Sequence, residues 1–455
     1  SLFLILLCTF ISICWFIRWW PIRRTEENVM ESDPYFHDCF YLLFLRRINR
    51  RTNWIYYPGS YLMNNIYNVS EKLFQLNDFS KKTRQDLHKI PELSGEEYKT
   101  SKYCRELMES FGYQIKTFDG YTGFTADLIV NADFPLIAIR ADMDGLEMPD
   151  LTNNEHSSIH QGCAHNCGHD THMTIALTAA KYLAENQAEM SANVRFIFQM
   201  AEEDMRVPGA DKMVELGCME GVDETYALHN DAAIETGCVR FNDGVMSSYG
   251  SAWTLDVYGV SAHGSTPHKG LDAIREATRL IDYMDYVVAK KTDPFSPAVF
   301  GCGMINGGTI PNALADHVQA RGTIRSMDEN TDKVLKESFN EIVARSTAGG
   351  FKTTLTATGY PAVINHPTAY QRLLEATRQF LPEENIESNG KPMTGSEDFS
   401  YMVNATKGKV GAMFFLGSGN QAKGINNYLH ANPYFVDDDC LLVGAQIFVN
   451  LLTRK

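Results

Sequence analysis

The chain has 455 residues, which is too long for one ordinary hydrophobic core and predicts two domains. Its hydrophobic content of 44% and charged content of 21% are typical of a soluble globular protein. The formal net charge of -15 argues against nucleic acid or an anionic membrane as a partner of the whole chain. The 10 cysteines are too sparse for a small disulfide-stabilised scaffold, and we expect reduced, mostly buried thiols.

Residues 1–78 differ in character from the rest of the chain. The stretch "SLFLILLCTFISICWFI" is an apolar run of signal-anchor length, and "RWWPIRR" follows it. Tryptophans and arginines in that place are typical of a membrane interface, with the following chain on the cytoplasmic side. No small-residue cleavage site is evident, which argues against a removed secretory peptide. Two interpretations stay open, a membrane anchor and an accidental upstream extension, and with either we expect the remaining chain to be cytoplasmic.

From residue 79 onward the sequence has the pattern of an α/β protein. The apolar runs "PLIAIRADMD" and "VRFIFQMAEED" are typical of buried strands, and residues 170–184 have the periodicity of a helix. Strands that alternate with helices predict a mostly parallel sheet covered on both faces. We therefore expect functional residues at the carboxyl ends of these strands, where the polar clusters "RADMD" and "AEED" occur.

Residues 251–361 follow a different order of elements. The expected sequence is a strand in "AWTLDVYGV", a helix over 271–288, strands in "AVFGCGMI" and "HVQARGTIRS", a helix over 331–345, and a strand in "FKTTLTATGY". This βαββαβ order is that of a ferredoxin-like sandwich. The α/β pattern resumes near residue 368, so the segment is predicted to be an insertion into a domain made of residues 79–250 and 362–455.

Several potential metal ligands follow predicted strands or precede a predicted helix. Each alone is weak evidence, because a lone histidine after a strand is usually an ordinary polar residue. Together they are hard to explain by chance, and a catalytic metal site needs donors from several strand ends and an open coordination position. The candidates are Cys167 and His169 before the helix, the adjacent carboxylates Glu202 and Glu203 in "AEED", His229 in "YALHN" and His430 in "NYLHANP".

The stretch "CAHNCGHDTHM" admits two other interpretations, a structural zinc knuckle and a disulfide. A knuckle usually needs four cysteine or histidine ligands in two closely spaced pairs. The chain has no second such cysteine pair, and the histidines of this stretch crowd one end of it. A catalytic metal site is therefore the favoured interpretation, and we expect no ligand role for Cys163.

The chain from about residue 82 to residue 452 resembles the M20 metallopeptidase family, in particular its amidohydrolase branch of aminoacylases, hippurate hydrolases and auxin-conjugate hydrolases. The resemblance rests on motifs in the family's order, namely "RQDLHKIPELSGEE", "RADMDGLEM", "HNCGHDTHM", "FQMAEED", "GVSAHGSTPH", "GTIRSMDEN", "GSEDFSYM" and a terminal "LH". It implies a metal-bearing catalytic domain and an inserted lid, residues 251–361, through which such proteins form homodimers. Asn166 stands where the branch often has alanine, and this departure removes no ligand.

The resemblance implies a role for each candidate residue. Two divalent ions, zinc or manganese, would be held by Cys167, His169, Glu203, His229 and His430, with the cysteine thiolate bridging them. Glu202 would be the general base, which makes physical sense because a carboxylate that binds no metal is free to take a proton. Asp144 and Asp170 would orient ligands, although Asp170 is equally suited to cap a helix.

The resemblance also implies a substrate site. His263 would reach the scissile carbonyl across the dimer, and Asn312 with Arg325 would bind the substrate carboxylate, for which the planar guanidinium is well suited. The expected activity is hydrolysis of N-acyl or N-aroyl amino acids. The alternatives are a dipeptidase or carboxypeptidase, for which Glu397 is a candidate to bind a free amino group, and a metal-binding scaffold without activity.

Overall fold

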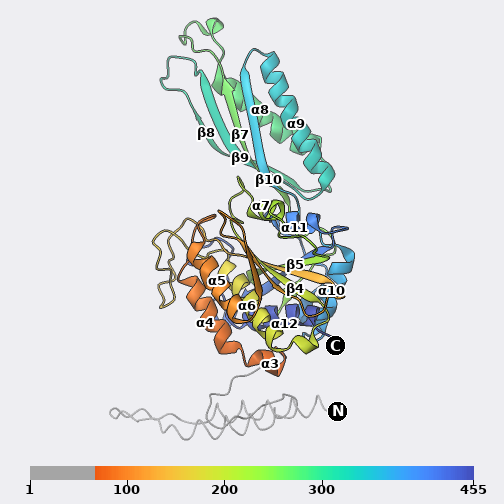
Figure 1. Cartoon of the computed structure of the whole chain (residues 1–455). Coiled ribbons are helices and arrows are strands. Elements are labelled where there is room, and N and C mark those ends of the chain that lie inside the picture. Colours follow the sequence, from red (N-terminus) through yellow and green to blue (C-terminus); the bar gives the residue numbers. More distant parts are fainter. Residues whose placement is uncertain (1–66, 455) are drawn as a thin grey trace, which may run out of the picture. The chain divides into compact units, whose positions relative to one another are not determined.

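The computed structural model describes residues 67–454, in which two β-sheets are formed by different parts of the chain (Figure 1). The larger sheet has eight strands in the order β1-β2-β4-β3-β5-β12-β6-β11. Parallel pairing joins β4 to β3, β3 to β5, β5 to β12 and β6 to β11. The strands are β1 Gln114–Thr117, β2 Phe124–Leu128, β3 Leu136–Asp142, β4 Asn193–Gln199, β5 Glu224–Glu235, β6 Val239–Arg240, β11 Ile386–Glu387 and β12 Gly411–Gly419. The protein is therefore an α/β protein with a large, mostly parallel sheet, as the sequence predicts.

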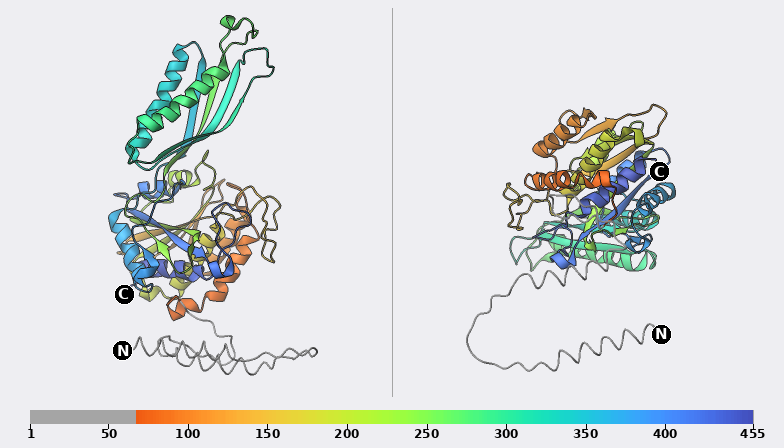
Figure 2. Two further views of the ribbon diagram at one scale, coloured as in Figure 1. Left: turned by 180° about the vertical axis from the view of Figure 1, so that it is seen from behind. Right: turned by 90° about the horizontal axis from the view of Figure 1, so that it is seen from below.

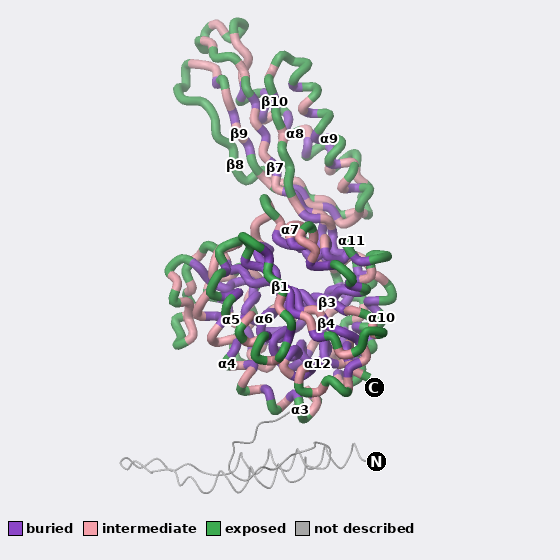
Figure 3. Tube along the Cα trace, viewed as in Figure 1, coloured by how far each residue is buried: buried purple, intermediate pink, exposed green. Residues whose placement is uncertain are grey.

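Helices cover this sheet because its central strands are apolar on both faces. Nearly every residue of α6 and α12 is buried, which is the pattern of helices enclosed by other elements (Figure 3). The helices are α3 Glu71–Phe74, α4 Asn77–His88, α5 Tyr98–Ser110, α6 His169–Glu185, α7 Gly209–Glu215, α10 Pro367–Arg378, α11 Phe399–Ala405 and α12 Cys440–Leu452, with single 3-10 turns at Gln187–Glu189, Glu383–Asn385 and Gln421–Lys423.

The smaller sheet confirms the predicted ferredoxin-like unit. Its strands lie in the order β10-β7-β9-β8 and all neighbours are antiparallel. Both of its helices pack on the same face of the sheet, as the view from behind in Figure 2 shows. The elements are β7 Tyr249–Tyr258, α8 Ala273–Lys290, β8 Ala298–Gly307, β9 His317–Ser326, α9 Glu329–Ala348 and β10 Lys352–Tyr360, with a 3-10 turn at Pro267–Lys269.

Helix caps account for where the two helices of this unit begin. Asp272 accepts hydrogen bonds from the backbone amides of Ile274 and Arg275, so α8 starts at Ala273, two residues after the predicted start. Asp328 caps α9 in the same way, and this helix starts two residues before its predicted position. The helical periodicity predicts that both helices exist, whereas the cap residues determine where each helix begins.

Each sheet has its own hydrophobic core, one on the larger sheet and one between the smaller sheet and its helices. The core of the larger sheet includes Val69 and Leu73, so packing begins N-terminal to residue 79. The boundaries of the catalytic domain and of the lid stay predictions. The predicted N-terminal anchor falls on residues 1–66, outside the described residues. Among residues 67–454, no helix combines the length and the apolar character that crossing a membrane requires.

Candidate metal centre and active site

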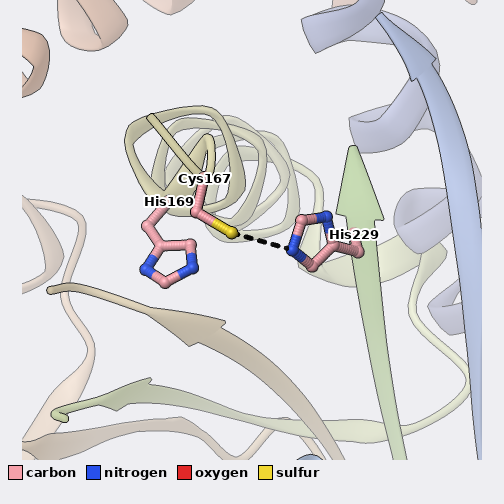
Figure 4. A group of neighbouring side chains, drawn as sticks. All are labelled: Cys167, His169 and His229. Atoms are coloured by element: carbon pink, nitrogen blue, oxygen red, sulfur yellow. Dashed lines mark hydrogen bonds between the residues drawn. The ribbon is translucent and has the colours of Figure 1, made fainter. Parts of the chain in front are cut away.

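The start of α6 brings Cys167 and His169 against β5, from which His229 projects (Figure 4). Gly168 between them has a φ of 86°, and a Cβ there would lie 2.0 Å from the side-chain oxygen of Asn230. Only glycine fits this contact. The Cys167 Sγ lies 3.4 Å from the Nε2 of His229, and Cys167, His169 and His229 can all offer ligand atoms to one point.

Backbone carbonyls orient both imidazoles toward that point. The Nδ1 of His169 lies 2.8 Å from the carbonyl oxygen of Asp144, and the Nδ1 of His229 lies 2.8 Å from that of Asn230. A carbonyl only accepts hydrogen bonds, so in the neutral imidazole that metal binding requires, each Nδ1 carries the proton and each Nε2 presents a lone pair. This is the arrangement in which a histidine binds a metal through Nε2.

Glu203 and His430 complete the group from two other parts of the chain. Glu203 follows β4, and its Oε1 lies 3.2 Å from the Nε2 of His430 and 3.9 Å from that of His169. Cys167, Glu203 and His430 form a second set of three atoms that could hold one ion. Within residues 67–454, the buried Nε2 of His169 and the buried Oε1 of Glu203 have no hydrogen-bond partner. These two atoms can both donate an electron pair to a metal ion, so their lack of other partners fits a metal site.

The carboxylates around the histidines leave an excess of negative charge. Burial disfavours a charged His169, yet the charges of Asp142 and Asp144 raise the pKa of this histidine to about 10. Burial and the neighbouring carboxylates, Glu397 first, hold the pKa of Glu202 well above its ordinary value. This cluster of side chains favours a positive charge on His169 and disfavours a negative charge on Glu202. The same excess of negative charge would attract a divalent cation.

The carboxylate of Glu202 is close both to His169, with its Oε2 3.9 Å from the Nε2 of that residue, and to a buried ion-pair network. Its carboxylate is within 4.8 Å of those of Glu397 and Asp398. Arg140 of β3 pairs with both of these acids, at 2.9 Å and 3.1 Å. Gln199 at the end of β4 donates hydrogen bonds to Asp398. Local sequence patterns do not predict this network, because its members are distant in the chain.

Three residues outside the predicted ligand set, namely His172, Asp170 and Asp144, have hydrogen-bond partners of their own. His172 places its Nδ1 2.6 Å from Asp142 and accepts a hydrogen bond from the Asn230 backbone amide at Nε2, so neither nitrogen is free for a metal. Asp170 is the second residue of α6, after a Gly168 cap, and accepts hydrogen bonds from Arg84 and His88. Asp170 is therefore not the helix cap. Asp144 contacts both His169 and the backbone of Glu203, which suits an orienting role.

Neither alternative interpretation of "CAHNC" describes the arrangement in the structure. Cys163 and Cys167 are both free thiols, so no disulfide joins them. The residues that converge with Cys167 come from β4, β5 and the C-terminal region, and Cys163 belongs to none of the groups that could hold an ion within residues 67–454. The donors are therefore gathered from distant segments, unlike those of a zinc knuckle.

The predicted substrate residues lie in two places on the smaller sheet and its loops. The Gly264 amide donates to the carbonyl of Asn312, which sets exposed His263 and Asn312 side by side. Arg325 lies on β9, half-buried, and donates a hydrogen bond to the hydroxyl of Ser396. No hydrogen bond or ion pair within residues 67–454 joins His263 or Asn312 to the metal-binding group.

Arg325 has no carboxylate partner within the described residues. Burial lowers the pKa of its guanidinium, and the hydroxyl of Ser396 is the partner that the structure provides. The approach of Arg325 to Ser396 depends on Gly250 of β7, where a Cβ would lie 1.7 Å from the Ser396 hydroxyl. A half-buried cation that is held in place by a neutral group is suited to receive an anion.

Comparisons with known proteins identify the family. The sequence profile of peptidase family M20/M25/M40 matches residues 138–454. "Thermostable carboxypeptidase 2" of Saccharolobus solfataricus is 31% identical over 388 residues, covering 84% of this chain and 97% of the relative. "N-acetyl-L-cysteine deacetylase" of Bacillus subtilis is 31% identical over 367 residues, covering 80% and 85%.

A solved structure agrees with this result. The crystal structure of the Bacillus subtilis YXEP protein, described as a dinuclear metal binding peptidase of the M20 family, has a TM-score of 0.69 and 25% identity. The match covers 83% of this chain and 98% of that one. The chain therefore belongs to peptidase family M20/M25/M40 and is a hydrolase by family, which confirms the resemblance noted in the sequence.

Proposed function

We propose that the protein is a metal-dependent amidohydrolase that cleaves the amide bond of N-acyl or N-aroyl amino acids. The observation that carries the proposal is the position of Glu202. It stands next to the candidate ligand Glu203, and its own carboxylate is close both to His169 and to the buried acids Glu397 and Asp398. One carboxylate can then bind metal while its neighbour handles protons.

The metal-binding residues of the proposal are Cys167, His169, Glu203, His229 and His430. Their thiolate and imidazole donors favour zinc, and the carboxylate also admits manganese. Two such ions, when bound, would activate a shared water for attack and stabilise the negative charge that develops on the substrate oxygen. The deprotonated Cys167 is suited to bridge them, since its sulfur belongs to both sets of ligand atoms.

Glu202 supplies the proton transfers of the proposed reaction. Its carboxylate takes the proton of the attacking water and then delivers it to the leaving amide nitrogen. Burial, and then the nearby acids with Glu397 first, raise the pKa of Glu202, and a cation bound beside it would lower that pKa again, so that the carboxylate could be ionised and take a proton. The adjacent Glu203 would hold metal and take no part in the proton transfers.

Arg325 is the proposed receptor for the substrate carboxylate. It is half-buried, and its hydrogen-bond partner is the neutral Ser396. Asn312 and His263 would contact the substrate from a second subunit, because in this chain they lie apart from the metal-binding residues. We also propose that the lid forms this homodimer through the edge strand β8, on which Val299, Met304 and Ile305 are about half exposed.

The alternative, a dipeptidase or carboxypeptidase, has the support of a relative named carboxypeptidase. A dipeptide substrate carries a free amino group, for which the enzyme would need an acidic partner. Glu397 was the candidate from the sequence, but it is 1% exposed and paired with Arg140. This commitment of Glu397 favours substrates with an acyl group in place of a free amine.

A substrate panel tests the proposal. The purified protein, loaded with zinc or manganese, is offered N-acetyl and N-benzoyl amino acids and matched dipeptides, beside a chelator-treated sample. We expect cleavage of the acylated amino acids that is lost with the chelator and restored by metal. Preferential cleavage of dipeptides would support the alternative, and two bound metals without any cleavage would support an inactive scaffold.

A further inference from the structure

The backbone that carries Glu202 and Glu203 is held by three buried side chains from different elements. The amide of Ala201 donates a 2.8 Å hydrogen bond to Glu97, and the amide of Glu203 donates one of 3.0 Å to Asp144. The carbonyl oxygen of Glu202 accepts a 2.6 Å hydrogen bond from the hydroxyl of Tyr360. The peptide that joins Glu202 to Glu203 is thus held at both its carbonyl and its amide, and the Ala201 amide before it is held by Glu97.

The turn needs such support because its backbone is strained. Ala201 has a φ of 49°, in the left-handed region that residues with a Cβ seldom adopt. This conformation is disfavoured for an L-residue, because its Cβ approaches the following carbonyl oxygen. The surrounding contacts must outweigh that cost, and the Gly209 amide adds one more by donating to the carbonyl of Ala201. Removing a contact would let the turn relax and move Glu202.

Tyr360 differs from the other two side chains in its origin. It is the last residue of β10, at which the chain leaves the smaller sheet, and it is 158 positions from Glu202 in sequence. Its ring is buried. Burial, Asp398 and Glu202 raise the pKa of its hydroxyl, so the group stays a neutral donor. The carbonyl of Glu202 can only accept, which fixes the direction of the hydrogen bond.

We propose that Tyr360 is a positioning residue for Glu202, through which the end of the lid sheet sets the place of the general base. Tyr360 acts on the backbone and touches no reacting atom. Within residues 67–454, no hydrogen bond joins its hydroxyl to a proposed metal ligand or to Arg325. The proposal rests on the proposed amide hydrolysis with Glu202 as the base.

Tyr401 of α11 provides a matched control. Its hydroxyl donates a 3.1 Å hydrogen bond to the carbonyl of Gly359, the residue just before Tyr360. Both tyrosines thus tie the same end of β10 to its surroundings by one phenolic hydrogen bond. Only Tyr360 reaches Glu202, so a general weakening of this junction affects both phenylalanine variants, and mispositioning of the base affects one.

The experiment compares Tyr360→Phe and Tyr401→Phe in the full metal-loaded chain, by kinetics, metal content and crystal structures. We expect Tyr360→Phe to lower kcat about tenfold or more, with KM within twofold and two metals retained, since small displacements of a catalytic group are costly. In the crystal structure of Tyr360→Phe, we expect the Glu202 backbone to be displaced or to adopt two conformations. Tyr401→Phe should keep both kcat and the Glu202 position.

Two results would overturn the proposal. One is a Tyr360→Phe enzyme whose kcat equals that of Tyr401→Phe. The other is a crystal structure of Tyr360→Phe in which Glu202 has not moved. This result does not depend on an activity assay. Failure of the wild-type protein to cleave any acylated amino acid would instead count against the proposed function, and the crystal structures would still decide the role of Tyr360.

Discussion

Asn166 and His430 are joined by their backbones, because the amide of His430 donates a 2.8 Å hydrogen bond to the carbonyl oxygen of Asn166. The side chain of Asn166 also donates a 2.7 Å hydrogen bond to the carbonyl of Ala431, the next residue. His430 has a φ of 64°, and its side chain is 48% exposed. Packing therefore does little to hold this candidate ligand, and the buried Asn166 fixes its turn.

Asn166→Ala is expected to weaken one of the two proposed metal sites. The substitution removes the side-chain hydrogen bond to Ala431 and leaves the His430 turn less ordered. Loss of an orienting contact to a ligand typically costs 10- to 100-fold in metal affinity. Titration against a chelator should show the loss at the site that contains His430, with the other site as an internal control. Equal weakening of both sites, or of neither, would contradict this role for Asn166.

Arg325→Met is expected to impair substrates that carry a free carboxylate. A charge-assisted hydrogen bond contributes about 1.5–3 kcal/mol, so kcat/KM should fall roughly 10- to 150-fold. The same variant should lose little toward the corresponding carboxamide substrate. Arg321→Met, four residues earlier on the exposed side of β9, is the matched control. If the two variants behave alike, Arg325 is not the carboxylate receptor.

Glu97 predicts a pH dependence of stability. Burial, and then the charge of Asp144, raise the pKa of Glu97 from an ordinary 4.5 to about 7. Between these values the folded protein keeps a proton that the unfolded chain has released. The free energy of unfolding should therefore fall as the pH rises from about 4.5 to about 7, by about 3 kcal/mol for this group alone. Above pH 7 its contribution is constant.

Denaturant unfolding of the metal-free protein at several pH values checks this prediction. Glu97→Gln keeps an acceptor for the Ala201 amide but cannot titrate, so its stability should lack the decline seen in the wild-type protein. The exposed neighbour Glu96 supplies the control, because Glu96→Gln should decline as the wild type does. Parallel curves for the wild type and Glu97→Gln would show that Glu97 titrates normally.

The sequence predicts the elements well because their signals are local. The alternation of strands and helices and the βαββαβ order follow from periodicities within each segment, and the predicted strand over residues 317–326 matches β9. The family motifs point to the donors that the structure brings together. The roles of Glu202 and of each ligand stay predictions.

The supporting contacts could not be predicted in this way. Arg140 pairs with Glu397 across 257 positions, and Tyr360 reaches Glu202 across 158. Neither pair has a local pattern, because the fold alone brings its members together. The sequence alone makes Glu397 a candidate partner for a substrate amine, whereas the structure pairs it with buried Arg140.

The most direct test of the central claim is Glu202→Gln. The amide has nearly the same size as the carboxylate and cannot accept the proton of water. We expect the variant to bind two metals, as the wild type does, and to lose at least a hundredfold in kcat toward an N-acyl amino acid, the usual contribution of a general base. A variant that binds two metals and keeps wild-type kcat would contradict the assignment of Glu202 as the base.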